Sequence, residues 1–170
     1  MKKKTLLLAF LAMLAMTCFG QEVTVNEMSG IKPGARINYS VDFSKSTIMG
    51  MTEEDFAGYE KDWKTDKPTV VGKLLKGMNT KLDGVLRMGS YKDSPYLLKV
   101  QVKTVTEQGN VICDATMEDS EGKVLFRVTN VNGGKEPPFL PGTKLAKIKV
   151  WANLCGRNLG DIIRSVYLGD

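Results

Sequence analysis

Asp114 and Glu118 have the residue types and the spacing that come nearest to a general acid–base pair in this chain. Residues four apart lie on the same face of a strand, and we expect the neighbouring strand to present Lys99 and Lys103 opposite them. A catalytic carboxylate needs surroundings that shift its pKa, which exposed strand positions do not provide. We therefore predict ion pairs across neighbouring strands and assign no catalytic residue.

The absence of histidine from the 170 residues excludes several kinds of site. Ser-His-Asp and Cys-His catalysis and His-ligated zinc or iron all need that side chain. The sequence also lacks the glycine-rich phosphate-binding motifs. Asp119, Glu121 and Gly122 lack the spacing of an EF-hand and indicate a hairpin turn instead. We predict no metal and no cofactor, so hydrolysis would depend on carboxylates or a Ser–Lys pair.

Cys113 and Cys155 fall on core-facing positions of two different elements. In an oxidising compartment they would form a disulfide if their Cα atoms come within about 7 Å. The alternative is a pair of buried, inert thiols, and the pattern leaves both open. No Cys-x-x-Cys pair is present, which excludes the usual redox-enzyme motif.

The first twenty residues have the pattern of a signal peptide. Lysines occupy positions 2–4, an apolar run covers 5–16, and Cys18 and Gly20 place small side chains before a cut at Gln21. The apolar run is shorter than the roughly twenty residues that cross a bilayer. We predict a protein exported to the periplasm or cell surface, without a transmembrane span after cleavage. The alternative is lipidation of Cys18, which would anchor it to the outer membrane, although the preceding residues lack the usual lipobox pattern.

Removal of the leader changes the charge balance. The whole chain has 24 Lys and Arg and 19 Asp and Glu, and three of the lysines leave with the leader. The remaining net charge of +2 is small, and the lysines are scattered among acids along the sequence. Nucleic-acid binding needs a clustered basic surface, so we predict no nucleic-acid partner. The size indicates one domain, at 36–170, after an extended lead-in at 21–35.

Periodicity predicts strands and helices that would position these residues. Apolar and polar residues alternate over 37–43 and over three segments within 96–129, which predicts a strand and a three-stranded antiparallel meander. Each segment has one apolar face, so the sheet should be covered on one side. A long final helix follows the N-cap Thr143, with an apolar stripe as far as Val166. Gly156 and Gly160 beside this stripe would let the helix lie close to the sheet or bend.

Two more helices are expected between the first strand and the meander. Thr52 is an N-cap candidate for the first, which would place Phe56, Tyr59 and Trp63 on one buried face. The second should open at Asp66, with Pro68 in its first turn, and end near 83–84. The expected fold is an α+β two-layer sandwich, with an antiparallel sheet of about four strands and helices on one face.

The connection 133–142 combines Gly and Pro with Phe139 and Leu140. Long connections often carry function, so these two side chains are candidates for a partner contact. The alternative is that the segment only links the last strand to the final helix.

The leader and four segments together resemble small uncharacterised envelope proteins of Gram-negative bacteria. The segments are 36–44, 109–110, 119–123 and 156–160. The resemblance implies a binding or assembly factor of the periplasm or outer membrane, and no catalytic residues carry over. We therefore expect a non-enzymatic exported binding or assembly module, whose partner is an envelope protein or an apolar ligand. The alternatives are a carboxylate–lysine enzyme with a groove near 133–142 and a carrier of an apolar molecule held between sheet and helices.

Overall fold

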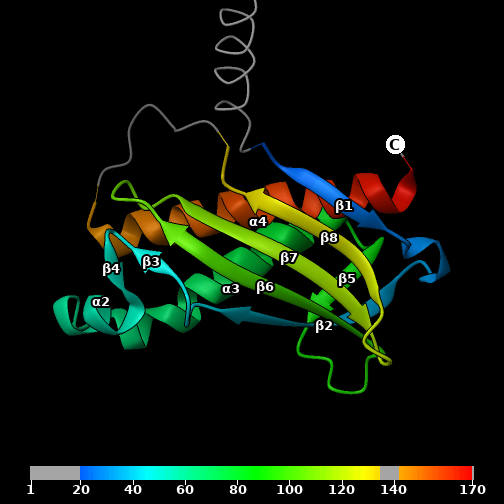
Figure 1. Ribbon diagram of the computed structural model, residues 1–170, viewed down its shortest axis with the longest axis horizontal. Coiled ribbons are helices and arrows are strands. Elements are labelled where there is room, and N and C mark those ends of the chain that lie inside the picture. Colours follow the sequence, from blue (N-terminus) through cyan, green and yellow to red (C-terminus); the bar gives the residue numbers. More distant parts are fainter. Residues whose placement is uncertain (1–19, 135–141, 170) are drawn as a thin grey trace, which may run out of the picture.

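The computed structural model describes residues 20–134 and 142–169. These residues form one sheet of eight strands, three α-helices and a short 3-10 helix (Figure 1). In chain order the elements are β1 (Glu22–Asn26), η1 (Met28–Gly30), β2 (Ala35–Asp42), β3 (Thr47–Ile48), β4 (Met51–Thr52), α2 (Glu53–Tyr59), α3 (Trp63–Leu82), β5 (Leu86–Gly89), β6 (Tyr96–Val105), β7 (Val111–Asp119), β8 (Val124–Val131) and α4 (Lys144–Leu168).

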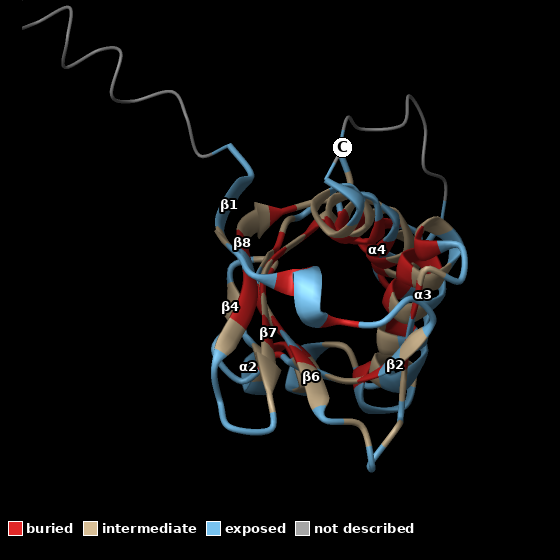
Figure 2. Ribbon diagram, turned by 90° about the vertical axis from the view of Figure 1, so that its right-hand side faces the viewer, coloured by how far each residue is buried: buried red, intermediate tan, exposed pale blue. Residues whose placement is uncertain are grey.

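Helices α3 and α4 lie side by side against one face of the curved sheet, and the buried residues lie between the two layers (Figures 1 and 2). The α+β class is confirmed, but the predicted sheet of about four antiparallel strands is wrong. The main strand order is β1-β8-β7-β6-β2-β5, and β2 runs parallel to both β5 and β6. The additional strands β1, β3, β4 and β5 span five residues or fewer, which is too short to show a clear alternation.

The meander is antiparallel as predicted, with pairs such as Val100 with Ala115 and Met117 with Phe126. These four side chains are buried under the helices, because successive residues of a strand point to opposite faces. The alternate side chains, Lys99 among them, lie on the opposite face, where all but Leu125 are exposed or half-buried.

The lead-in packs onto the rest of the chain. Strand β1 pairs antiparallel with β8 at one edge of the sheet, and Met28 and Ile31 are buried behind it. The Tyr167 hydroxyl near the end of α4 donates a hydrogen bond to the Ile31 carbonyl at 2.9 Å. The end of α4 is therefore in contact with the segment around η1.

Thr52 caps α2 as predicted, since its hydroxyl accepts a hydrogen bond from the Asp55 amide at 3.2 Å. Phe56 and Trp63 are buried and stack edge to face with their ring centroids 5.3 Å apart. Tyr59, however, is 61% exposed, so its predicted core position is wrong. The three aromatic residues do not lie on one helical face, because α2 ends at Tyr59 and the chain turns before α3 begins at Trp63.

Helix α3 begins at Trp63 rather than at the predicted Asp66, and Asp62 precedes it without a side-chain capping bond. Asp66 lies in the first turn, where it pairs with Lys149 of α4 at 2.7 Å. The predicted end is confirmed, because Leu82 is the last helical residue and Asp83 follows with φ 48°.

Glycines allow α3 and α4 to pack closely. A Cβ atom on Gly160 would lie 2.5 Å from the Met78 carbonyl oxygen, and one on Gly156 would overlap the Leu74 carbonyl. Gly77 on α3 faces the backbone of Asn153 in the same way. The prediction that the α4 glycines approach the sheet is therefore wrong, since they approach the neighbouring helix. Gly156 faces Leu74 and Gly160 faces Met78, so residue numbers increase in the same direction along both helices. The two helices therefore run parallel.

Candidate functional site

The acidic residues of the meander form the ion pairs expected from the sequence. Lys99 pairs with Glu118 at 2.6 Å and Lys103 with Asp114 at 3.6 Å, across β6 and β7. Asp114 also accepts a hydrogen bond from the Asn130 amide at 2.8 Å. Each carboxylate thus has a partner on the open face of the sheet, an arrangement that stabilises strand pairing.

The hairpin at 119–123 is closed by its own side chain. Asp119 accepts hydrogen bonds from the amides of Glu121 and Lys123, each at 2.9 Å, and Gly122 has φ 81°. Within 20–134 and 142–169, no group of three or more Cys, Asp or Glu side chains is arranged to hold a metal ion.

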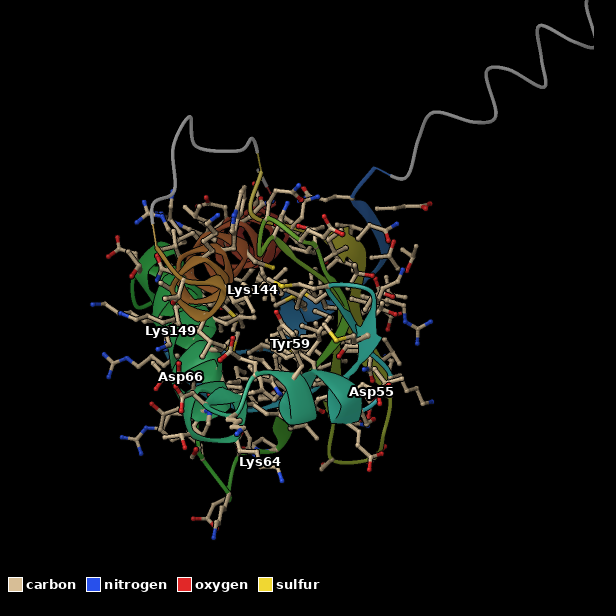
Figure 3. The ribbon with its side chains drawn as sticks, turned by 90° about the vertical axis from the view of Figure 1, so that its left-hand side faces the viewer. Asp55, Tyr59, Lys64, Asp66, Lys144 and Lys149 are labelled. Carbon is tan, nitrogen blue, oxygen red and sulfur yellow. The ribbon has the colours of Figure 1, made fainter. Side chains whose placement is uncertain are left out.

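A second group of lysines and acids lies where α2 meets the first turns of α3 and α4 (Figure 3). The Lys144 amine donates to the Tyr59 hydroxyl at 3.1 Å and lies 4.4 Å from the centre of that ring. The Asp66–Lys149 pair lies beside it and joins α3 to α4. These contacts hold the three helices together, and each charged group of the two pairs is engaged with its neighbour.

A groove lies at the start of β2, next to the loop 90–95. It encloses about 850 Å³. The loop projects from the sheet as the green segment at the bottom of Figure 1. The charged and aromatic side chains that line the groove are Lys32, Arg36, Tyr91, Lys92, Asp93 and Tyr96. Three cations and one carboxylate give this surface a net positive charge.

Hydrogen bonds fix the loop against β2. The Ser94 hydroxyl donates to the Arg36 carbonyl at 2.7 Å and accepts from the Tyr96 amide at 3.1 Å. The Arg36 guanidinium lies 5.4 Å from the centre of the Tyr91 ring. A Cβ atom on Gly89 would come within 2.9 Å of that ring, so the glycine leaves the space that the tyrosine occupies. The groove therefore presents a guanidinium and a phenol ring in a defined arrangement.

Asn79 holds the strand that leads into this loop. Its side-chain amide donates to the Met88 carbonyl at 2.8 Å and accepts from the Met88 amide at 2.9 Å. The two bonds tie the edge strand β5 to helix α3.

We expect Asn79→Ala to lower the free energy of unfolding by about 2 kcal/mol, because it leaves both half-buried backbone groups of Met88 without partners. Urea denaturation followed by circular dichroism measures this change. Thr80→Ala is the control, since the Thr80 hydroxyl bonds only within α3 at an exposed position. An equal loss in both variants would contradict a specific role for Asn79.

The structure brings Cys113 and Cys155 together. Their sulfur atoms lie 3.6 Å apart, both residues are fully buried, and both are free thiols. The hydrogen bond with Cys155 and the burial of the site raise the pKa of the Cys113 thiol well above its usual value. The other candidate residues, Cys18, Phe139 and Leu140, lie outside the described residues. None of the helices within the described ranges is long and apolar enough to cross a membrane.

No protein-family model and no curated protein matches this chain. Among solved structures, the PelC dodecamer from Paraburkholderia phytofirmans is 12% identical, with 83% of this chain and 96% of that chain aligned and a TM-score of 0.44. Protein XCC0632 from Xanthomonas campestris is 11% identical, with 88% and 95% aligned and a TM-score of 0.45. Similarities at this level do not assign a family or a function.

Sequence reasoning missed the groove at 90–95. The groove is lined by two segments that are more than fifty residues apart, and their sequences, Lys32-Pro33-Gly34 and Ser94-Pro95, indicate only turns. The parallel pairing of β2 with β6 brings them together, and no local pattern reveals that pairing.

Proposed function

We propose that this protein is a non-enzymatic, exported binding module of the bacterial envelope, and that the groove beside 90–95 binds its ligand. The observation that carries the proposal is that this one groove combines a volume of about 850 Å³, a net positive charge and two tyrosine rings. The signal-peptide pattern of the first twenty residues supports export.

The groove suits an extended anionic chain that bears carboxylates. Guanidinium groups bind carboxylates through two parallel hydrogen bonds, so Arg36 is the best placed anchor. Lys32 and Lys92 add positive charge, while Tyr91 and Tyr96 supply flat apolar surface. A volume of about 850 Å³ is in the range of known ligand sites.

The two other candidate functions have less support. The lysine–carboxylate pairs at Lys99–Glu118, Lys103–Asp114 and Lys149–Asp66 have structural roles and none of them lines this groove. A carrier would need free space between the layers, yet large side chains such as Trp63 and Trp151 are buried there.

Site-specific photo-crosslinking in an exporting cell tests the proposal. Lys92→benzoylphenylalanine places the reactive group at an exposed position in the groove, and Arg127→benzoylphenylalanine places it at an exposed position on the outer face of β8. We expect a discrete adduct at position 92 that is absent at position 127. Adducts of the same size at both positions, or at neither, would contradict a ligand site in the groove.

Arg36→Ala provides a second measurement. We expect it to weaken binding of an oligogalacturonate or of a polyglutamate peptide by about tenfold to a hundredfold, the effect of one lost charged hydrogen bond. Calorimetric titration measures the affinity, and Arg127→Ala is the matched control because it removes the same charge elsewhere.

A further inference from the structure

Basic and acidic residues are unevenly divided between helices α3 and α4 and the rest of this protein. Helices α3 and α4 together carry ten Lys and Arg and two Asp, which gives them a net charge of +8. The remainder of 21–170 has eleven basic and seventeen acidic residues and a net charge of −6. The sequence pattern indicates lysines scattered among acids, but α3 and α4 hold ten of the twenty-one basic residues of 21–170 and two of its nineteen acids.

Folding collects the cations because both helices bury their apolar faces against the sheet and turn their polar faces outward. Three of the lysines have acidic partners: Lys67 pairs with Glu53, Lys81 with Asp161 and Lys149 with Asp66. Within the described part of the chain, no carboxylate lies at ion-pair distance from Lys73 or Lys76, which are both exposed.

Apolar side chains lie among these cations. A shallow groove of about 450 Å³ between the helices is lined by Lys73, Lys76 and Lys149 around Val150 and Leu154. Val150 is 41% exposed. We call the outward surface of α3 and α4 around this groove the basic face. At 1.5 Å per residue the twenty residues of α3 make it about 30 Å long.

We propose that the basic face docks on the surface of an anionic phospholipid bilayer. Eight of the ten cations of α3 and α4 are lysines, whose hydrated, flexible ammonium groups suit mobile lipid headgroups better than a fixed pattern of phosphates. Each basic residue near an anionic membrane contributes about 1 kcal/mol of attraction. Val150 and Leu154 supply apolar contact at the level of the headgroups.

The acidic remainder of the molecule supports a single orientation. Because the rest of the molecule, helix α2 included, carries a net negative charge, an anionic membrane repels it while it attracts α3 and α4. The protein would then lie with α3 and α4 toward the lipid and the outer face of the sheet away from it. This inference does not depend on the ligand groove beside 90–95.

Vesicle co-sedimentation tests the proposal with the exported, processed protein in a Cys18→Ser background, so that an acyl anchor cannot contribute. We expect binding to vesicles of phosphatidylcholine with phosphatidylglycerol, weaker binding at higher salt, and little binding to phosphatidylcholine alone. Lys73→Gln with Lys76→Gln should weaken binding about thirtyfold, the effect of about 1 kcal/mol for each lysine. Lys45→Gln with Arg127→Gln removes the same charge from exposed positions outside α3 and α4 and should change binding less than about twofold.

Equal binding to both kinds of vesicle would overturn the proposal, as would an equal loss in the two double variants. The proposal would also be overturned if the protein did not bind vesicles but was retained on duplex DNA or heparin, and if the Lys73→Gln, Lys76→Gln variant lost that retention. This result would assign the basic face to a polyanion. Unchanged thermal unfolding of both variants shows that the differences come from the surface.

Discussion

Gly156→Ala is expected to lower the free energy of unfolding by about 3 kcal/mol. The added methyl group would overlap the backbone carbonyl of Leu74 in α3. Backbone atoms in the middle of a twenty-residue helix cannot rotate away as a side chain can. The helices must therefore separate, which loosens the packing of neighbours such as Cys155 and Leu159. Urea denaturation followed by tryptophan fluorescence reports the change, because Trp63 and Trp151 are both buried.

Gly72→Ala is the matched control for this substitution. Gly72 lies in the same helix pair but is exposed, and a Cβ atom built there meets nothing within 4 Å. Because alanine is the better helix former, we expect Gly72→Ala to raise the free energy of unfolding by about 0.8 kcal/mol. Effects of the same sign and size at both positions would show that α3 and α4 do not pack through Gly156.

Local signals predicted the elements that have long and regular patterns. The meander and α4 span eight or more residues each, so alternation or helical spacing is unambiguous in them. The caps at Thr52 and Thr143 were also predictable, because a hydroxyl before a helix accepts a bond from an amide in its first turn. These elements account for the α+β class and for the buried position of Cys113 and Cys155.

Features that depend on distant pairing were not predictable from local patterns. Strand β5 has four residues, and its parallel place beside β2 follows from the crossover through α3 rather than from its own sequence. The parallel pairing of β2 with β6 brings Arg36 next to the loop 90–95 and so creates the groove. The basic face likewise depends on α3 and α4 lying side by side, which gathers lysines that are about seventy residues apart in the sequence.

The exported protein is expected to form a disulfide between Cys113 and Cys155. The structure brings their sulfur atoms to 3.6 Å, and an oxidising compartment favours the bond. The two residues are 42 apart, so closing this loop stabilises the folded state by about 4 kcal/mol in the chain-entropy model. For a domain of this size we expect oxidation to raise the melting temperature by about 10 °C. Thermal unfolding with and without a reductant, in a Cys18→Ser background, measures the shift.

Burial determines when this bond can form. The raised pKa of the Cys113 thiol keeps it protonated in the folded protein, and the thiolate is the species that reacts. Oxidation should therefore occur before the core closes, and protein that has folded in reductant should resist later oxidation. Cys155→Ala is the control, in which the reductant should have no effect on melting. Two reactive thiols titrated in denaturant, in protein exported without reductant, would contradict the disulfide and leave a pair of buried thiols that contribute through packing alone.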